Sequence, residues 1–379
     1  MKRILFYFQQ VGGANALWPL IDEWGGLFEM VVGGRPKISD HLKRKGVVPA
    51  DAAPYGCSSA AADAWLRDIG PDILVTDTID LGRAPDTCFG RSLWRAARRR
   101  AIPSIAYVDC WWGYRQRFFP GGKTQPSILP DTVAVIDRTA ADQALEAGLG
   151  EARVRVLGSP LFAELKTRRA GLKNGVRTAA REKLGLPRDT FLVLYVSQPF
   201  STGFGTEADW GFSPVSVLKD LLRVLEGAGG KTRRLTLLVL MHPEDAGDDL
   251  FLAGTGATGV SVVFRRGGAP HDYLLASDLV CGSFSILLTE AVILGLPVLS
   301  LQPGLRREDI LITNLSGATR PVRTDGELKT HFLRAVVDGG YRRELLRRQD
   351  GFEFVTDSLH LWRRQVLGML SQEHVHAHG

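Results

Sequence analysis

Residues 275–304 read LASDLVCGSFSILLTEAVILGLPVLSLQPG, and this stretch decides the fold class. It contains, in order, an apolar run, a turn of small residues, a helical segment ended by glycine and proline, and a second apolar run: 279–281, 282–285, 286–294 and 298–301. A small-residue turn before a helix presents free backbone N–H groups and the positive end of the helix dipole to one point. The stretch therefore predicts a strand–turn–helix–strand unit with a phosphate site at Ser283, Phe284 and Ser285.

Glu290 lies a little over one turn inside this predicted helix, where its carboxylate would reach a ribose hydroxyl just beyond the phosphate. The same pattern is also compatible with an ordinary strand–helix–strand unit in which Ser285 only caps the helix. The segment alone supports both interpretations, and the rest of the chain favours the phosphate site.

The composition is that of an ordinary globular protein, with 379 residues, 45% hydrophobic and 23% charged. This length exceeds what one hydrophobic core usually supports, so two domains are expected. The start, MKRILFYFQQ, has too short an apolar run for a signal peptide and reads as a first strand. The four cysteines lack metal-ligand spacing, which predicts a reduced, cytoplasmic protein without a structural zinc site.

The chain is basic, with a formal net charge of +6 and a sequence pI of about 9.2. No nucleic-acid-binding motif accompanies the basic clusters, so anionic small substrates or an anionic membrane face are the expected partners. The stretch 111–119, where Arg115 and Arg117 lie among aromatic residues, is the candidate surface for peripheral membrane contact.

Short apolar runs alternate with amphipathic stretches through both halves of the chain. In the first half the predicted strands are 4–8, 28–32, 73–76, 104–108, 133–136 and 154–157. In the second half they are 191–196, 235–240, 260–264, 279–281 and 298–301. Strands joined by crossover helices form parallel, doubly wound sheets that bind ligands at the carboxyl ends of the strands. We therefore expect an α/β protein with two Rossmann-like domains facing a central cleft.

Several short motifs occur along the chain, and their order carries information about the family. They are GGAN after the first strand, VRVLGSP at the end of the first half, MHP after a strand of the second half, and RRED after the opening segment: 12–15, 154–160, 241–243 and 306–309. In this order, together with 275–301, they resemble the GT-B glycosyltransferases and their relatives, the non-hydrolysing nucleotide-sugar 2-epimerases. The resemblance covers most of the chain as separate fragments.

The resemblance implies the GT-B fold, with one domain for the acceptor and one for the donor. Residues 1–160 would form the acceptor domain, and residues 161–356 the domain that binds the nucleotide-sugar donor. The segment 357–379 would form a helix that crosses back to the N-terminal domain, followed by a tail.

The departures from the epimerase pattern concern the catalytic acids. Asp77 and Asp109 align roughly with two acidic positions of the epimerases, but no third carboxylate lies in an E-x-x-N-R context. Epimerisation by elimination and re-addition, as the family implies, needs several acid–base groups around the sugar. The incomplete set therefore favours sugar transfer over epimerisation.

An inverting transferase needs a general base and groups that stabilise the departing phosphate. Asp109 is the first choice for the base, because it ends a strand and the aromatic residues after it would raise its pKa by desolvation. Asp77 is the second choice. His242 would assist the phosphate or the leaving oxygen, although a structural histidine is the alternative.

The remaining candidates divide into two groups. The donor would be bound by His242 together with Gly12, Gly13, Ser197, Gln198, Ser283, Phe284, Ser285, Glu290, Arg306 and Arg307. The acceptor would stack on Trp111, Trp112 and Tyr114, for which core packing is the alternative.

The sequence thus predicts a cytoplasmic glycosyltransferase that moves a sugar from a nucleotide-activated donor to a glycan, lipid-linked or small-molecule acceptor. We expect it to be inverting, to need no metal and no cofactor, and not to bind nucleic acid. The alternatives are a nucleotide-sugar 2-epimerase or a hydrolysing relative, and a catalytically inactive nucleotide-binding partner of a polysaccharide assembly. The oligomeric state stays open.

Overall fold

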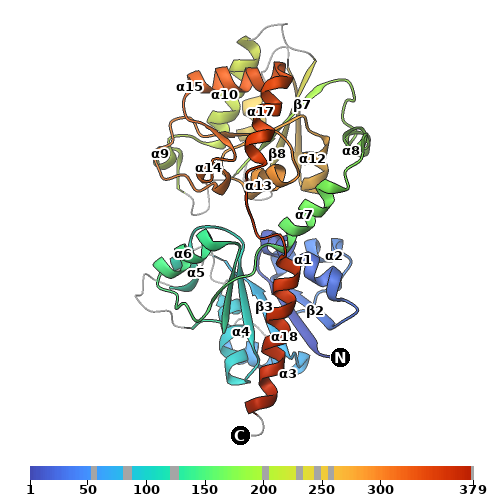
Figure 1. The fold of residues 1–379 in the computed structure, drawn as a ribbon, viewed down its shortest axis with the longest axis vertical. Coiled ribbons are helices and arrows are strands. Elements are labelled where there is room, and N and C mark those ends of the chain that lie inside the picture. Colours follow the sequence, from blue (N-terminus) through green and yellow to red (C-terminus); the bar gives the residue numbers. More distant parts are fainter. Residues whose placement is uncertain are drawn as a thin grey trace. The chain divides into compact units, whose positions relative to one another are not determined.

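A computed structural model describes residues 1–52, 58–79, 88–119, 128–198, 205–227, 234–242, 249–254 and 260–376. The chain forms two compact units, each described here by itself (Figure 1). Unit 1 comprises Met1–Glu164 and Phe354–Gly379, and unit 2 comprises Leu165–Glu353. Each unit is a parallel six-stranded sheet covered by helices, which confirms the predicted α/β class with two Rossmann-like domains.

Unit 1 has the strand order β2-β1-β3-β4-β5-β6. Its strands are β1 (Arg3–Phe8), β2 (Glu29–Gly34), β3 (Ile73–Asp77), β4 (Ser104–Val108), β5 (Thr132–Val135) and β6 (Val154–Val156). Its helices are α1 (Val11–Trp24), α2 (Ser39–Arg44), α3 (Ser59–Ile69), α4 (Cys88–Arg99), α5 (Tyr114–Phe118), α6 (Arg138–Glu146) and α18 (Ser358–His376), with the short turn η1 (Pro36–Ile38). The strands β3 and β4 are buried along their whole length, because helices cover both faces of the sheet.

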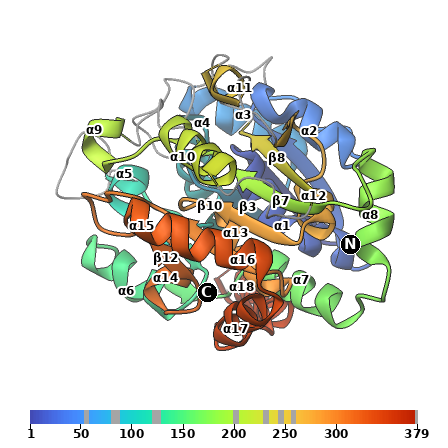
Figure 2. The same cartoon turned by 90° about the horizontal axis from the view of Figure 1, so that it is seen from above.

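Unit 2 has the strand order β12-β11-β10-β7-β8-β9. Its strands are β7 (Phe191–Val196), β8 (Leu235–Met241), β9 (Ser261–Arg266), β10 (Leu279–Gly282), β11 (Val298–Leu301) and β12 (Arg320–Val322). Its helices are α8 (Val176–Leu184), α9 (Glu207–Trp210), α10 (Pro214–Gly227), α11 (Asp249–Gly254), α12 (Pro270–Ala276), α13 (Ile286–Ile293), α14 (Ile312–Leu315), α15 (Asp325–Glu327), η5 (Leu328–Phe332), α16 (Leu333–Val337) and α17 (Gly339–Gln349), and α7 (Pro160–Ala170) leads into it. Figure 2 shows α10 and α13 on opposite sides of the strands β7 and β10.

The strand order reverses once in each sheet. In unit 1 the first strand β1 pairs with β2 on one side and with β3 on the other. In unit 2 the first strand β7 pairs with β8 on one side and with β10 on the other. Ligands of open α/β sheets bind outside the carboxyl ends of the strands at such a reversal. The two reversals therefore indicate where to look for functional side chains.

The C-terminal helix α18 belongs to unit 1, where its red ribbon lies along the blue and cyan elements (Figure 1). Trp362 is completely buried, packs edge-on against Tyr107 and donates through Nε1 to the carbonyl of Gly158 at 3.3 Å. Ser358 donates to the carbonyl of Leu157 at 2.8 Å. These contacts fasten the end of the chain to the loop after β6. None of the described helices is long and apolar enough to cross a membrane.

Two features of the fold differ from the sequence-based expectation. The sequence places the last strand at 298–301, but a further parallel strand, β12, pairs with β11. It was missed because it has only three residues and contains Pro321, which is tolerated at the edge of a sheet. The GGAN motif at 12–15, expected after the first strand, lies in the first turns of α1, which begins at Val11.

Candidate functional site

Asp77, the last residue of β3, is fully buried beside the N-terminus of α1. Its Oδ1 accepts the backbone N–H of Gln9 at 2.7 Å, and its Oδ2 accepts that of Gln10 at 2.8 Å. Burial raises the pKa of Asp77 to about 8; the charge of Asp109 also raises it, whereas the two N–H groups and Arg117 lower it. The carboxyl group is therefore largely protonated at neutral pH.

The two glutamines join the ends of β1 and β3 across the reversal of unit 1. Nε2 of Gln9 donates to the carbonyl of Asp77 at 3.0 Å, and Nε2 of Gln10 donates to the carbonyl of Thr78 at 2.9 Å. Sequence reasoning missed both residues. The available signal was a pair of amides directly after an apolar strand, separated by one residue from two glycines.

The glycine pair of α1 leaves room for both carboxylates. A Cβ atom on Gly13 would lie 2.4 Å from Oδ2 of Asp77, and a Cβ atom on Gly12 would lie 3.0 Å from Oδ2 of Asp109. The first turn of α1 therefore lies directly against Asp77 and Asp109. This placement gives the glycines a role beside the acids of unit 1, whereas the sequence predicted donor binding for them.

Asp109, which follows β4, is only half-buried and accepts no hydrogen bond from the side chain of any other described residue. Burial raises the pKa of Asp109, against the nearby positive charge of Arg117, which lowers it. The predicted rise by desolvation is thus present. Of the two acids, Asp109 is the one with surface available to a ligand.

Arg117 on α5 completes this cluster and was not predicted as a site residue. It is buried, and its Nη1 donates to the carbonyl of Thr78 at 2.8 Å and to its Oγ1 at 3.0 Å. Its Nη2 donates to Sγ of Cys110 at 3.1 Å. The sequence offered only an arginine among aromatic residues, which suggested a surface. Burial of Arg117 removes it from the membrane-contact face expected at 111–119.

The aromatic residues after Asp109 pack mostly inside unit 1. Trp111 is 5% exposed and donates through Nε1 to Asp137 at 2.6 Å, and Tyr114 is 3% exposed and donates to the carbonyl of Cys110 at 3.2 Å. Their buried rings offer no face on which a sugar acceptor could stack, which corrects that expectation. Trp112 is half-buried, and its ring lies 5.8 Å from the guanidinium of Arg117.

In unit 2, Ser197 and Ser283 follow the two strands that flank the reversal, since Val196 pairs with Gly282. Both serines are buried. The carbonyl of Ser283 accepts hydrogen bonds from Oγ of Ser300 at 2.8 Å and from Nε2 of Gln302 at 3.0 Å. These two bonds fix the orientation of the turn that leads into α13.

Ser285 is the N-cap of α13 and accepts the N–H of Leu287 at 3.4 Å. Glu290, one turn further on, is buried and pairs with His271 of α12, with 2.6 Å between Oε2 and Nε2. Sequence reasoning also missed His271, because it lies 19 positions away from Glu290 on another helix. The pairing engages one carboxylate oxygen of Glu290.

Phe284 and the two arginines lie at an aromatic cluster beside this turn. The ring of Phe284 lies 4.8 Å from that of Trp210, and the guanidinium of Arg307 lies 5.1 Å from Trp210 on another side. Arg306 donates through Nη1 to the carbonyl of Ala208 at 3.1 Å. Both arginines are exposed and contact the segment around α9.

Two further predicted residues also follow strands of unit 2. His242, after β8, and Gln198, near the end of β7, are half-buried. Pro243, which accompanies His242 in the motif, lies outside the described residues.

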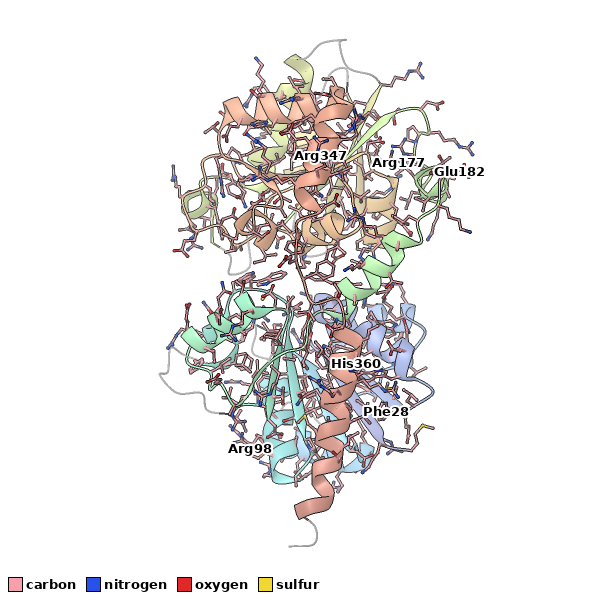
Figure 3. All side chains as sticks on the ribbon, viewed as in Figure 1. Phe28, Arg98, Arg177, Glu182, Arg347 and His360 are labelled. Carbon is pink, nitrogen blue, oxygen red and sulfur yellow. The ribbon has the colours of Figure 1, made fainter. Side chains whose placement is uncertain are left out.

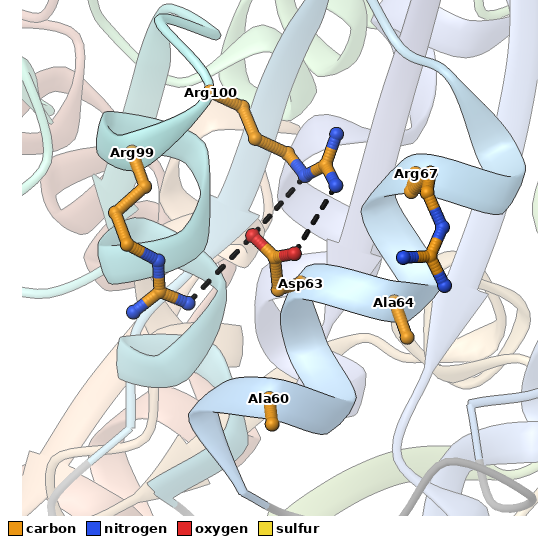
Figure 4. A pocket seen from close by; sticks show the side chains of 6 residues that line it. All are labelled: Ala60, Asp63, Ala64, Arg67, Arg99 and Arg100. Atoms are coloured by element: carbon orange, nitrogen blue, oxygen red, sulfur yellow. Dashed lines mark hydrogen bonds and ion pairs between the residues drawn. The ribbon is translucent and has the colours of Figure 1, made fainter.

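A surface pocket of about 890 Å³ lies between α3 and α4 and is lined by Ala60, Asp63, Ala64, Arg67, Arg99 and Arg100 (Figure 4). Its lining residues come from most of the length of α3 and from the C-terminal end of α4. Asp63 pairs with Arg100 at 3.1 Å and with Arg99 at 3.7 Å. None of the predicted site residues lines this pocket.

Other basic side chains lie on the outside of their units, as Arg98, Arg177 and Arg347 do in Figure 3. Among the described residues, no group of three or more histidine, cysteine or acidic side chains is arranged to hold a metal ion.

Comparison with known proteins places this geometry in a structural context. No protein-family model matches the chain, and no curated protein matches it by sequence. UDP-GlcNAc 2-epimerase from Neisseria meningitidis, solved with UDP-GlcNAc bound, is 13% identical with a TM-score of 0.65, over 97% of this chain and 100% of that one. UDP-GlcNAc 2-epimerase from Methanocaldococcus jannaschii is 12% identical with a TM-score of 0.61, over 96% and 99%. A glycosyltransferase from Rickettsia africae is 12% identical with a TM-score of 0.62, over 98% of each chain.

These likenesses establish the GT-B-like fold that the sequence predicted. They also correct the leading functional prediction, because several of the similar structures are UDP-GlcNAc 2-epimerases. The prediction of a glycosyltransferase is therefore wrong, and the comparison favours the alternative of a nucleotide-sugar 2-epimerase. The sequence-based choice of reaction rested on a count of carboxylates, which carries no information on the burial of Asp77 and Arg117.

Proposed function

We propose that this chain is a nucleotide-sugar 2-epimerase, and that UDP-GlcNAc is its first candidate substrate. The observation that carries the proposal is the pair of acids Asp77 and Asp109, both with raised pKa values, at the carboxyl ends of adjacent strands. Similarity in fold to epimerases, one of them solved with UDP-GlcNAc bound, supports the choice of substrate.

The chemistry requires a base for the proton on C2 of the sugar. Asp109 would take this proton, since it is the half-exposed acid of the pair. The C2–H electrons form a double bond to C1 while the C1–O bond breaks, and its electrons leave on the nucleoside diphosphate. Return of a proton to the other face of C2, with re-formation of the C1–O bond, gives the epimer. A base with a pKa raised towards neutrality suits both removal and return of a proton.

Unit 2 would supply the nucleotide-binding groups. The turn at Ser283, Phe284 and Ser285 leads into the N-terminus of α13, where free N–H groups favour a phosphate. Glu290, oriented by His271, would accept hydrogen bonds from the ribose hydroxyls through its remaining carboxylate oxygen. Ser197, on the neighbouring strand end, would add a hydroxyl donor.

The test is incubation of the purified protein with UDP-GlcNAc and no acceptor, followed by chromatographic separation of UDP-GlcNAc from UDP-ManNAc. We expect UDP-ManNAc to form, and Asp109→Asn to slow its formation by roughly 10²- to 10⁴-fold, as for loss of a general base. Asp72→Asn is the matched control. Asp72 directly precedes β3 at the opposite edge of the sheet, where it accepts the N–H of Arg3 at 2.6 Å.

Each alternative gives a different result in this experiment. Release of free UDP with no epimer would identify a hydrolysing relative. Binding of UDP-GlcNAc without any turnover, unchanged by Asp109→Asn, would identify an inactive nucleotide-binding protein. Either result would contradict the proposal.

A further inference from the structure

The side chain of Arg117 hydrogen-bonds to the chain neighbours of both acids, although it does not hydrogen-bond to Asp77 or Asp109 itself. Nη1 binds Thr78, the residue after Asp77, and Nη2 binds Cys110, the residue after Asp109. The guanidinium therefore links the carboxyl ends of β3 and β4 directly behind the acids. Its Nε donates to no described residue.

The anchors of Arg117 are themselves held in place. The carbonyl of Thr78 also accepts Nε2 of Gln10, and Oγ1 of Thr78 donates to the carbonyl of Tyr107 on β4 at 3.1 Å. The thiol of Cys110 donates to the carbonyl of Trp112 at 3.2 Å. With 5% of its surface exposed, Arg117 thus holds a permanent positive charge at one fixed place beside Asp77 and Asp109.

We propose that Arg117 is the positioning residue of the acid pair: it sets the spacing of the strand ends that carry Asp77 and Asp109, and its buried positive charge favours the ionised form of Asp109. This inference rests on the proposed function, in which an ionised Asp109 takes the C2 proton.

The electrostatic reason is direct. Two neighbouring acids with one proton between them carry one negative charge, and one buried guanidinium balances it. Arg117 lowers the pKa of both acids, against burial, which raises both. The other titratable groups around the cluster are Cys110, Tyr107, Tyr114 and Asp137, and burial raises the pKa of each of them. Thiol, phenol and carboxyl groups are neutral or negative at any pH, so Arg117 is the cation among these described residues.

The experiment compares Arg117→Gln, which removes the charge, with Arg117→Lys, which keeps it but loses the two-pronged contact. The pH profile of kcat/KM is measured for epimerisation of UDP-GlcNAc. For Arg117→Gln we expect the acid limb to move upward by roughly 1–3 pH units, with activity partly recovered at high pH, because removal of the positive charge raises the pKa of Asp109. For Arg117→Lys we expect the limb to stay near its original position while kcat falls.

Arg181→Gln is the matched control. Arg181 is equally buried, at 5% exposure, and its guanidinium binds the carbonyls of Ala276, Arg188 and Thr190 in unit 2. We expect this variant to lose stability without a shift of the acid limb. If Arg117→Gln also leaves the limb in place, or if Arg181→Gln shifts it equally, the proposal is overturned.

A second readout needs no turnover. The Cγ resonances of Asp77 and Asp109 are followed against pH in protein labelled with ¹³C at aspartate Cγ, with Asp77→Asn and Asp109→Asn for assignment. An upward shift of the aspartate pKa values in Arg117→Gln, with a smaller shift in Arg117→Lys, supports the role of Arg117. Wild-type protein without epimerase activity would refute the proposed function but would leave this result on Arg117 intact. Unchanged titration in both folded variants overturns the role of Arg117. If Arg117→Gln fails to fold, Arg117→Lys still tests the positioning role, because a folded Arg117→Lys with the kcat of wild type would overturn it.

Discussion

At the scale of single residues, Asp77 combines complete burial with two backbone hydrogen bonds and a pKa raised to about 8. An aspartate in an unfolded chain has a pKa of about 3.9. The native state therefore holds its proton over a pH range in which the unfolded chain has lost it. The stability that Asp77 contributes is complete below about pH 4 and is lost as the pH rises towards its native pKa.

Asp77→Asn should remove this pH dependence. Asparagine cannot accept from both Gln9 and Gln10, so we expect the variant to be less stable than wild type at low pH. Between about pH 4 and about pH 8 the difference in the free energy of unfolding should shrink, because only wild type loses stability from this group. Urea unfolding across this range measures it, and Asp72→Asn is the control. A difference independent of pH would contradict a protonated Asp77.

Gly13→Ala tests the contact between α1 and the acids. Alanine is intrinsically better in a helix by up to about 1 kcal/mol. Here its Cβ would lie 2.4 Å from Cβ and from Oδ2 of Asp77, so we expect destabilisation of about 1–3 kcal/mol from overpacking. Gly26→Ala, just beyond the other end of α1 with no atom within 4 Å, is the control. Thermal unfolding in which Gly13→Ala is as stable as wild type would refute the close contact.

Local sequence predicted some properties of these residues and not others. The desolvation of Asp109 followed from the aromatic residues directly after it. The roles of Gln10 and Arg117 depend on contacts 67 and 39 positions away along the chain, which no local pattern encodes. An arginine among aromatic residues resembles a surface patch until the packing of α5 is known.

At the scale of elements, β11 has a buried glutamine near each end. Gln302 follows the strand and donates to the carbonyl of Ser283, whereas Gln349 of α17 binds the N–H of Val298 and the carbonyl of Leu296 at its start. Both are almost inaccessible to solvent. They therefore form a matched pair, in which only Gln302 supports the turn before α13.

We expect UDP to raise the thermal unfolding midpoint of wild type and of Gln349→Ala. In Gln302→Ala we expect UDP to raise the midpoint much less. Loss of either amide leaves buried partners unpaired, so both variants should lose about 1–3 kcal/mol of stability. Glu290→Ala should abolish the response to UDP. A saturating ligand at a hundredfold excess over its dissociation constant stabilises by about 2.7 kcal/mol, which makes the comparison clear. Equal responses in the two glutamine variants would contradict a phosphate site at this turn.

Elements with strong apolar periodicity were predictable, and short ones were not. The strands β7, β8 and β10 lie where the apolar runs indicated them, since parallel central strands are continuous apolar segments. The three-residue strand β12 and the short helix α5 are set by tertiary packing. Parallel edge pairing and a single helical turn leave little trace in a sequence.

At the scale of the whole molecule, the last helix folds with the first unit. Trp362→Ala should cost about 3–5 kcal/mol, because it empties a completely buried site next to Tyr107. Hydrogen–deuterium exchange should then rise in β4 and around Gly158 but not in β7 or β10. Leu367→Ala, at an exposed position of the same helix, should have little effect. Increased exchange in unit 2 alone would contradict the assignment of α18 to unit 1.

The choice of reaction was the step at which the sequence misled at this scale. Ordered motifs were sufficient for the fold, because the GT-B-like arrangement tolerates wide divergence, as identities of 12–13% to similar structures illustrate. The proposed reaction depends on the acids of unit 1, and their pKa values follow from burial and charge in the folded chain.

Epimerisation by way of C2 makes one direct demand, which is exchange of the C2 proton with solvent. The most direct measurement is incubation with UDP-GlcNAc in D₂O, without acceptor, followed by proton NMR of the sugar. We predict that deuterium enters C2 of the UDP-ManNAc formed, and that exchange is strongly slowed by Asp109→Asn. Retention of hydrogen at C2 in both nucleotide sugars, with no epimer formed, would contradict the proposed function.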